Sequence, residues 1–245
     1  MRKYLSTTFV ALAAIGLGGC VYKRLWNTHQ LLCTDHNLVT FSVLHDGSKA
    51  LEFHHTSLLA DDVAWLLGKA PTSVETDENG VVHEWTAHNA NAAEPDRYRI
   101  RVGMDFENED DGLYLKRIRV PQPLASVMSA NLLEQTIRAA CDVKLKLWSK
   151  GVVFDLSEIH DADIPDPATL RQALGEPIPS STDTRLDYRF CIEPCSQNPE
   201  SADHAVVRMR YSATGAPESY YLKYLRYEAN ADMVNKQGLI RLVGD

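Results

Sequence analysis

An internal duplication limits the folds open to this chain more strictly than any other feature of its sequence. When the sequence is shifted against itself by 107 residues, several stretches align identically. These are Leu67-Gly68 with Leu174-Gly175, Arg101 with Arg208, Tyr114-Leu115-Lys116 with Tyr221-Leu222-Lys223, and Arg119 with Arg226. A shift of 108 places Cys33 on Cys141, each after a helix-like segment. Because similarity at a fixed offset marks repeated structural units, we predict two tandem modules, at residues 26–123 and 124–245.

The first module carries the local signals of helices and antiparallel strands. Residues 38–44 alternate between apolar and polar side chains, which predicts a strand. A helix capped by Thr56 or Ser57 is predicted to end at Gly68. The dipeptide Asn79-Gly80 predicts a tight hairpin turn.

The second module begins with one long helix, predicted over residues 126–140. Asp166 and Pro167 are typical of a helix start, and this helix should end at Gly175. Further strands are predicted over 98–106, 113–120, 185–192, 204–212, 219–227 and, as an edge strand, 238–243. Helices segregated from hairpins indicate the α+β class, with helices packed on an antiparallel sheet in each module.

The first nineteen residues are typical of a signal peptide. Arg2 and Lys3 precede an apolar run over residues 5–17, which is shorter than the roughly 20 residues of a membrane-spanning helix. The run ends in Leu17-Gly18-Gly19-Cys20, which resembles the lipobox of bacterial lipoproteins. This resemblance implies removal of residues 1–19 and attachment of palmitate-type acyl chains to Cys20. The alternative is an ordinary secretory signal with a chance cysteine.

The same resemblance implies a location in the bacterial envelope. Acyl chains on Cys20 would anchor the protein, with residues 20–25 as a tether. Val21, and not an aspartate, follows the lipidated position, which in lipoproteins of this kind favours the outer membrane. We therefore expect the inner leaflet of the outer membrane, facing the periplasm, with the inner membrane as the alternative.

Four cysteines besides Cys20 predict two disulfides, because an even number in an oxidising compartment favours pairing. We favour Cys33 with Cys141, which occupy equivalent places in the two modules, and Cys191 with Cys195, which are near neighbours. Zinc binding through Cys191 and Cys195 is the alternative, and the lack of another ligand at suitable sequence spacing disfavours it.

The charge balance excludes one class of partner. Removing residues 1–19 takes away two basic residues and no acidic one, so the formal charge changes from −8 to −10. The chain has no block of Lys and Arg, so nucleic-acid binding is not expected. A basic protein partner fits the acidic composition.

The sequence lacks the common catalytic signatures, namely G-x-S-x-G, H-E-x-x-H, the Walker A loop and G-x-G-x-x-G. We considered metal ligation by His54-His55 with Asp61 and Asp62, and by His83-Glu84 with His88. Neighbouring histidines on an extended segment point to opposite faces, which disfavours both sets. No enzyme activity, cofactor or metal site is therefore predicted.

Two surface features are candidates for binding a protein partner. Tyrosines crowd one predicted strand, and exposed tyrosines make good interface anchors, although packing beneath the helices is an equal alternative. Acidic residues crowd one turn, which otherwise is a solvated turn or, with poorly matching spacing, a calcium loop. The residues are Tyr220, Tyr221, Tyr224 and Tyr227 in the strand, and Glu107, Glu109, Asp110 and Asp111 in the turn.

Each module has a helix ending in Leu-Gly, a proline within three residues, and then a strand bearing aromatic residues. The matching residues are Leu67-Gly68, Pro71 and Trp85, and Leu174-Gly175, Pro177, Tyr188 and Phe190. This pattern resembles the tandem repeats of β-lactamase inhibitor proteins and the small BamE-type barrel-assembly lipoproteins. The chain departs from both in the extra helix and cysteine that begin each module.

The resemblance implies a scaffold that binds proteins and performs no chemistry. We therefore expect a non-catalytic, protein-binding periplasmic lipoprotein, of the inhibitor or immunity type. One alternative is an envelope-assembly or structural lipoprotein of BamE-like type. Another is an enzyme or ligand carrier with an unfamiliar site between the modules.

Overall fold

The computed structural model describes residues 21–34, 39–45, 47–77, 80–92, 95–109, 112–127, 129–141, 151–195, 204–224 and 227–242. The predicted signal peptide and Cys20 lie outside these residues. Within the described residues, no helix combines the length and the apolar character needed to span a bilayer. The helices are one over residues 21–34, α2 (Ala60–Leu67), α3 (Gln122–Val127), α4 (Ala130–Cys141) and α5 (Pro167–Leu174), with the 3-10 turns η1 (Pro95–Tyr98) and η2 (Asp161–Asp163).

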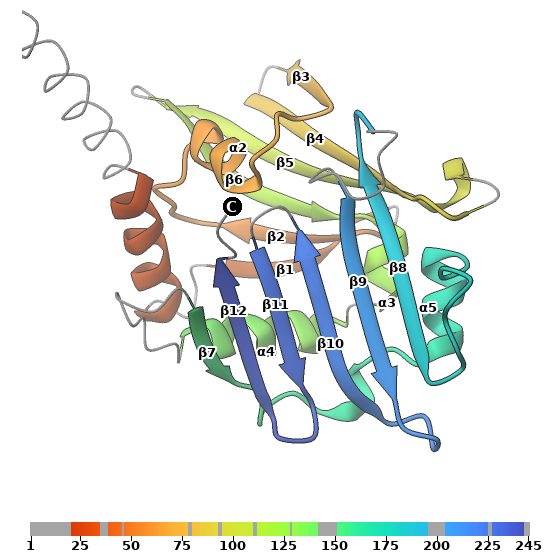
Figure 1. The fold of residues 1–245 in the computed structure, drawn as a ribbon. Coiled ribbons are helices and arrows are strands. Elements are labelled where there is room, and N and C mark those ends of the chain that lie inside the picture. Colours follow the sequence, from red (N-terminus) through yellow and green to blue (C-terminus); the bar gives the residue numbers. More distant parts are fainter. Residues whose placement is uncertain are drawn as a thin grey trace, which may run out of the picture.

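The described strands join into one continuous antiparallel sheet (Figure 1). It has twelve strands in the order β1-β2-β6-β5-β4-β8-β9-β10-β11-β12-β7, with β3 paired to β4 beside this path. The strands are β1 (Val39–Val43), β2 (Lys49–Phe53), β3 (Ser73–Asp77), β4 (Gly80–Asn89), β5 (Arg99–Glu109), β6 (Gly112–Val120), β7 (Gly151–Asp155), β8 (Arg185–Ile192), β9 (His204–Tyr211), β10 (Pro217–Tyr224), β11 (Tyr227–Asp232) and β12 (Gln237–Leu242).

The predicted fold class, α+β with a separate sheet in each module, is wrong, because the fold is dominated by this single sheet. The reason lies in β4, which continues beyond its pairing with β3 and offers three more residues to β8. The pairs are Ala87 with Ile192, His88 with Cys191, and Asn89 with Phe190. An unpaired strand edge carries free main-chain donors and acceptors, so joining the two edges satisfies both.

We call β1–β6 the first half-sheet, β7–β12 the second half-sheet, and the three pairs between β4 and β8 the junction. The strands of the first half-sheet run across those of the second in Figure 1, so the sheet bends strongly. The junction is short. It has three residue pairs, whereas β4 forms eight pairs with β5 along its other edge.

Helices α2 and α5 occupy equivalent places in the duplication. Their bounds differ by 107 residues at both ends, which is the offset found in the sequence. Each ends at a glycine with positive φ, 63° at Gly68 and 82° at Gly175, a backbone conformation that suits glycine. Strands β5 and β6 follow α2 in the same order as β9 and β10 follow α5.

The starts of these two helices differ. The predicted cap of α5 is confirmed, because the Asp166 carboxylate accepts the backbone N–H groups of Ala168 at 2.8 Å and Thr169 at 2.9 Å. The predicted cap of α2 is wrong: Leu59 is the N-cap residue, and neither Thr56 nor Ser57 is. Asp62 accepts the Leu59 N–H at 3.0 Å, so an acidic side chain inside the first turn does the capping.

The long helix predicted over residues 126–140 is two helices, α3 and α4. The Ser129 hydroxyl accepts the backbone N–H of Leu132 at 2.9 Å and so starts α4 afresh. The predicted strand over 219–227 also divides, because β10 ends at Tyr224 and β11 begins at Tyr227. The C-terminal strand β12 is not an edge, since it lies between β11 and β7.

Helices cover one face of the sheet, which we call the inner face. In the first half-sheet, Ala60 and Val63 of α2 pack against a cluster that includes Trp85, Phe106 and Leu115. In the second, Leu170 and Leu174 of α5 pack against Leu186, Tyr188 and Met209. The opposite face, here the outer face, is left for polar side chains.

Candidate functional site

The outer face of the second half-sheet carries arginines that lie above a buried carboxylate. Asp187 of β8 has a side chain only 4% exposed, and it accepts hydrogen bonds from Arg185 at 2.6 Å and Arg208 at 3.0 Å. The two arginine side chains are 39% and 38% exposed. The acid is therefore the buried member of the cluster, and the guanidinium groups face the solvent.

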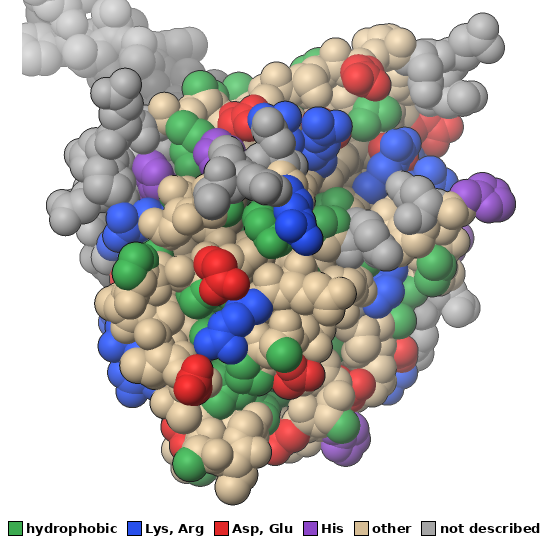
Figure 2. All heavy atoms as spheres, turned by 90° about the vertical axis from the view of Figure 1, so that its right-hand side faces the viewer, with side chains coloured by type: hydrophobic (Ala, Val, Ile, Leu, Met, Phe, Trp, Pro, Cys, Tyr) green, Lys and Arg blue, Asp and Glu red, His purple; other side chains and the backbone are tan. Residues whose placement is uncertain are grey.

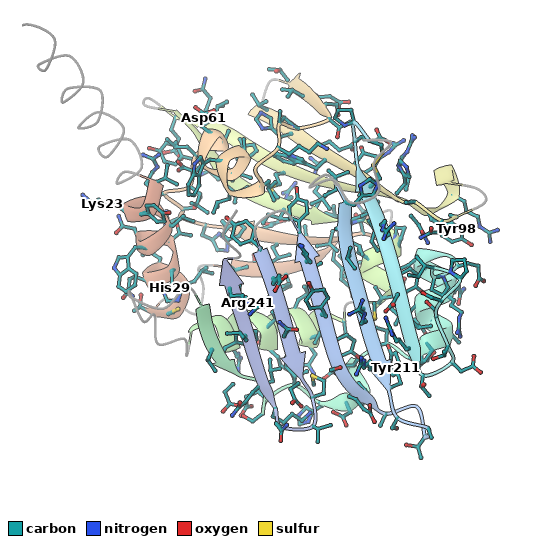
Figure 3. All side chains as sticks on the ribbon, in the orientation of Figure 1. Lys23, His29, Asp61, Tyr98, Tyr211 and Arg241 are labelled. Carbon is teal, nitrogen blue, oxygen red and sulfur yellow. A yellow bond between two sulfur atoms is a disulfide. The ribbon has the colours of Figure 1, made fainter. Side chains whose placement is uncertain are left out.

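This polar network continues across the neighbouring strands. The Arg208 guanidinium lies over the Tyr221 ring, 5.6 Å from its centroid, and the Tyr221 hydroxyl donates to Glu228 at 3.1 Å. Arg241 of β12, labelled in Figure 3, contacts Glu228 at 2.6 Å. The side chain of Glu228 is 10% exposed and that of Arg241 is 54% exposed. The hydrogen bond from Arg241 holds the pKa of Glu228 below its usual value.

The first half-sheet repeats this arrangement. Asp105 of β5 is 18% exposed and contacts Arg119 at 2.8 Å and Arg117 at 3.3 Å, both on β6. Arg117 also contacts Glu52 of β2 at 3.2 Å. The arginines are again the more exposed partners, at 43% and 36%.

Strand register places these groups on one face of the continuous sheet. Arg117 is the cross-strand partner of Asp105, Arg208 of Asp187, and Arg241 of Glu228. We call the resulting surface the arginine face, defined by Arg117, Arg119, Arg185, Arg208 and Arg241. Acidic and basic side chains are interspersed on the side of the molecule seen in Figure 2, whereas the five residues of the arginine face are all cations. A chain with net negative charge thus presents cations locally.

The four tyrosines proposed as partner contacts do not share one surface. Tyr220 and Tyr211 pack on the inner side with ring centroids 6.4 Å apart, and burial raises the pKa of both hydroxyls. The Tyr224 hydroxyl donates to the carbonyl of Leu67 at 3.0 Å, and Tyr227 is half-buried. Tyr221 alone among the four joins the arginine face.

The proposed acidic turn lies between β5 and β6. Glu107 and Glu109 each contact Lys116 of β6 at 3.1 Å, so a lysine of the same hairpin neutralises part of their charge. Asp110 and Asp111 lie outside the described residues. The pairing of Cys33 with Cys141 stays a prediction too, because the side chain of Cys141 is outside the described part of the chain.

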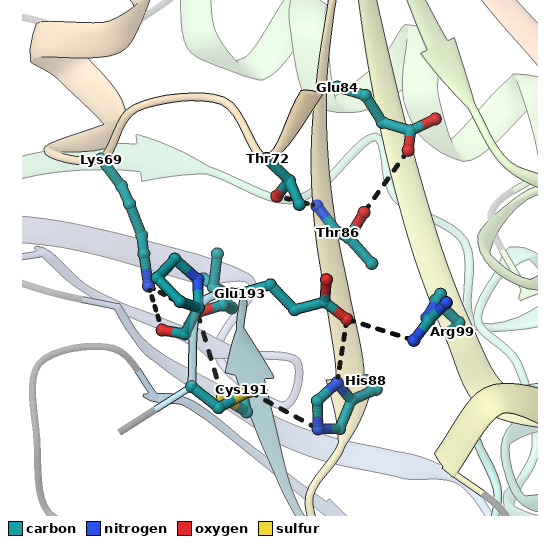
Figure 4. Close-up of polar contacts among 11 residues, drawn as sticks. Lys69, Thr72, Glu84, Thr86, His88, Arg99, Cys191 and Glu193 are labelled. Atoms are coloured by element: carbon teal, nitrogen blue, oxygen red, sulfur yellow. Dashed lines mark hydrogen bonds and ion pairs between the residues drawn. A yellow bond between two sulfur atoms is a disulfide. The ribbon is translucent and has the colours of Figure 1, made fainter. Parts of the chain in front are cut away.

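A second cluster of polar groups lies at the junction, on the outer face (Figure 4). Cys191 and Cys195 form the disulfide predicted from their spacing, with their sulfurs 2.05 Å apart. The Nε2 atom of His88 is 3.6 Å from the Cys195 sulfur, and its Nδ1 atom is 3.6 Å from the Glu193 carboxylate. Arg99 contacts the same carboxylate at 3.4 Å.

Sequence reasoning considered His88 together with His83, and the structure separates them. His83 points to the inner face, with its ring 4.9 Å from that of Phe106, and burial lowers its pKa. His88 lies on the outer face beside the two cysteines. The signal for this grouping was absent from the local sequence because His88 and Cys191 meet only through the pairing of β4 with β8.

The inner side of the junction holds an apolar cavity of about 170 Å³. Trp85 and Ala87 of β4, Ile100 of β5 and Ile192 of β8 contribute to its wall. The Tyr224 ring closes one side, held there by its hydrogen bond to Leu67 at the end of α2. Its volume is comparable to that of an engineered apolar cavity of about 150 Å³ that binds benzene.

Comparison with known proteins assigns no family to this chain. No protein-family model, no curated protein and no solved structure matches it.

Proposed function

We propose that this protein is a non-catalytic, lipid-anchored binding protein of the bacterial envelope that holds an acidic surface of a protein partner against its arginine face. The observation that carries this proposal is the layering of charge in both half-sheets. Carboxylates that are 4% to 18% exposed lie beneath arginines that are 36% to 54% exposed.

This layering favours binding because it fixes the arginines before a partner arrives. A free arginine loses side-chain entropy when it is immobilised at an interface. Arg185 and Arg241 each make paired hydrogen bonds with their carboxylate, so part of that entropy is already lost in folding. Planar guanidinium groups also match carboxylates well, and arginine is enriched at interface hot spots.

The partner chemistry follows from the local charge and not from the net charge. Each buried carboxylate is covered by one or two arginines, so an approaching protein meets the cations first. This replaces the basic partner expected from composition with a partner that offers Asp or Glu side chains.

The N-terminal helix supports a short link to the membrane. Arg24 contacts the Asp62 side chain of α2 at 2.5 Å, and Asp62 is 1% exposed. Tyr22 packs against Trp65 of α2 with ring centroids 5.7 Å apart. Residues 21–25, predicted as part of a tether, are helical and docked on the body, so acyl chains on Cys20 would hold the body close to the bilayer surface.

The test is affinity capture from detergent-solubilised envelopes with the full lipidated chain. The variant Arg119→Gln/Arg241→Gln removes one arginine from each half-sheet and leaves Asp105 with Arg117 and Glu228 with Tyr221. We expect a stoichiometric partner whose affinity falls at least about tenfold in this variant and falls with rising salt, since two interface arginines are worth more than about 1.4 kcal/mol.

The matched control is Arg138→Gln, which removes an arginine that is 73% exposed and pairs with Glu134 on α4, away from the sheet. It should leave capture unchanged. The proposal fails if no stoichiometric protein is recovered, or if the control and the double variant lose the partner equally. Recovery of a single secreted protein favours the inhibitor or immunity role, and recovery of a multi-subunit membrane complex favours the assembly role.

A further inference from the structure

We infer that the junction holds a redox-gated binding site for a zinc-class divalent cation, made by Cys191, Cys195 and His88. The Nε2 or Nδ1 atom of His88 and the sulfurs of the two cysteines all lie within 4.8 Å of one another. Two sulfurs and an imidazole nitrogen are a donor set typical of zinc in proteins. The site forms only when the disulfide is reduced, because cysteine binds a metal ion as a thiolate.

The backbone holds these three residues together independently of the disulfide. His88 and Cys191 are direct cross-strand partners at the junction. The Lys69 ammonium donates to the carbonyls of Ile192 at 2.5 Å and Pro194 at 3.2 Å, which lie on both sides of Glu193 (Figure 4). The segment that leads to Cys195 is therefore fixed at two points, which keeps Cys195 close to Cys191 after reduction.

Glu193 has the position of an orienting carboxylate. It faces the Nδ1 atom of His88 at 3.6 Å, on the opposite side of the ring from Cys195, and Arg99 holds the same carboxylate at 3.4 Å. Metal-bound histidines in proteins usually direct their second nitrogen at such a carboxylate. A proton kept on Nδ1 leaves the Nε2 lone pair directed at the sulfurs.

The two cysteines differ in solvent exposure, and this decides which sulfur a reductant attacks. Cys195 is exposed, whereas Cys191 is 2% exposed. A thiolate of an external dithiol attacks the Cys195 sulfur, the bond between the two cysteines breaks, and Cys191 leaves as a thiolate. The second thiol of the donor then attacks the mixed disulfide, releases Cys195 as a thiolate and closes the donor's own disulfide. Two electrons have passed to the protein.

The required rearrangement is small. Zinc binds sulfur at about 2.3 Å and imidazole nitrogen at about 2.0 Å, so ligand atoms around one ion lie roughly 3.5 to 4 Å apart. The His88 nitrogen is already 3.6 Å from the Cys195 sulfur. Three protein ligands leave the fourth tetrahedral position for water. The thiols lose their protons as the cation binds.

The test uses the full chain, reduced with dithiothreitol, freed of reductant without oxygen, and titrated with Co²⁺ and then Zn²⁺. We expect thiolate-to-cobalt charge-transfer absorption that saturates at a single equivalent, is displaced by Zn²⁺, and is absent from the oxidised protein. Binding should weaken at least about tenfold in His88→Ala and about tenfold in Glu193→Gln, the range typical of ligand and outer-shell losses.

The matched control is His204→Ala, because His204 is the cross-strand partner of Cys191 on the other side, in β9, and is not part of the three-residue group. It should bind Co²⁺ like the parent chain. The variant Cys33→Ser/Cys141→Ser should also retain the absorption. The inference is overturned if the signal survives in Cys191→Ser/Cys195→Ser or if His88→Ala binds as tightly as His204→Ala. The histidine comparison stands even where the cysteine variants fail to fold.

Discussion

At the scale of single residues, Asp187 is the group on which the arginine face depends most. Removing this carboxylate takes away the charged hydrogen bonds of two arginines, and because both guanidinium groups stay exposed to water, the expected cost is about 1.5 to 3 kcal/mol. We therefore expect Asp187→Ala to lower the free energy of unfolding by about that amount in urea titrations. Asp183→Ala is the control, because Asp183 is fully exposed and lies 3.7 Å from Arg171. Equal midpoints for the two variants would contradict this account.

Gly175 offers a second test at this scale, because its backbone, with a ψ of −167°, is in a region almost restricted to glycine and its Cα faces an aromatic ring. Gly175 and Gly215 have nearly the same φ, 82° and 84°. A Cβ atom on Gly175 would lie 2.9 Å from the ring of Tyr98, whereas nothing lies within 4 Å of one on Gly215. Tyr98, labelled in Figure 3, lies in η1 between β4 and β5, and its ring packs against the end of α5.

Both alanine variants carry the cost of a positive φ, about 1 kcal/mol or more. We expect Gly175→Ala to be the more destabilising of the two in thermal unfolding, because it also displaces Tyr98. A Tyr98→Ala background should narrow the difference, and what is left measures the backbone cost at Gly175. Identical melting temperatures for the two single variants would show that the ring moves aside without cost.

At the scale of elements, the cap of α5 gives the protein a dependence on acidic pH. The backbone N–H of Thr169 donates to Asp166 and lowers its pKa in the folded state. A depressed carboxyl pKa contributes stability that is present above the unfolded value, about 3.9, and is lost as the pH falls through the folded value. Stability should therefore decline in this range partly through Asp166.

Asp166→Asn should remove this contribution to the loss of stability at acidic pH, here called the acid limb. It should keep most of the cap, because asparagine accepts the same N–H groups. Asp166→Ala should cost about 1 kcal/mol at neutral pH. Urea midpoints measured from neutral to acidic pH distinguish the two variants. An unchanged acid limb in Asp166→Asn would assign the pH dependence to other carboxylates.

Local signals were enough to predict many elements but not their assembly. The hairpin of β3 and β4, the cap at Asp166 and the bounds of β8 follow from short-range sequence preferences, and the structure has them. Strand β11 was missed because its two alanines, its asparagine and its aspartate have weak strand preference. The pairing of β4 with β8 joins distant segments, and no local pattern announces it.

The arginine face was predictable only in part for a related reason. The duplication drew attention to Arg119 and Arg208, but their acidic partners are not duplicated. Asp187 falls on Gly80 at the offset of 107 residues. Which acid lies beneath which arginine is decided by strand register, and register here depends on the bulge between Asp105 and Phe106 and on the junction.

At the scale of the whole molecule, the short junction raises the question of whether the half-sheets unfold together. Only three residue pairs join the ladders. The core nevertheless crosses the junction, because Ile100 of β5 packs in the same cluster as Leu186 and Leu170 of the second half. We expect one cooperative unit, with amides of β5 and β9 showing the same opening free energy in native-state hydrogen exchange. A lower value for the whole second half-sheet would make it a separate unit.

The layering of charge on the arginine face has a consequence for the speed of complex formation. At physiological ionic strength, the attraction of exposed arginines is screened beyond about 8 Å, so a more distant acidic partner senses mainly the net charge, which is −10 once residues 1–19 are removed. The arginines attract the partner only at close range. The net negative charge therefore slows the approach of an acidic partner, whereas the arginine face holds it once the complex has formed. Moderate salt should therefore raise the association rate constant and also raise the dissociation rate constant. In a pair steered together by long-range attraction, salt instead lowers the association rate constant.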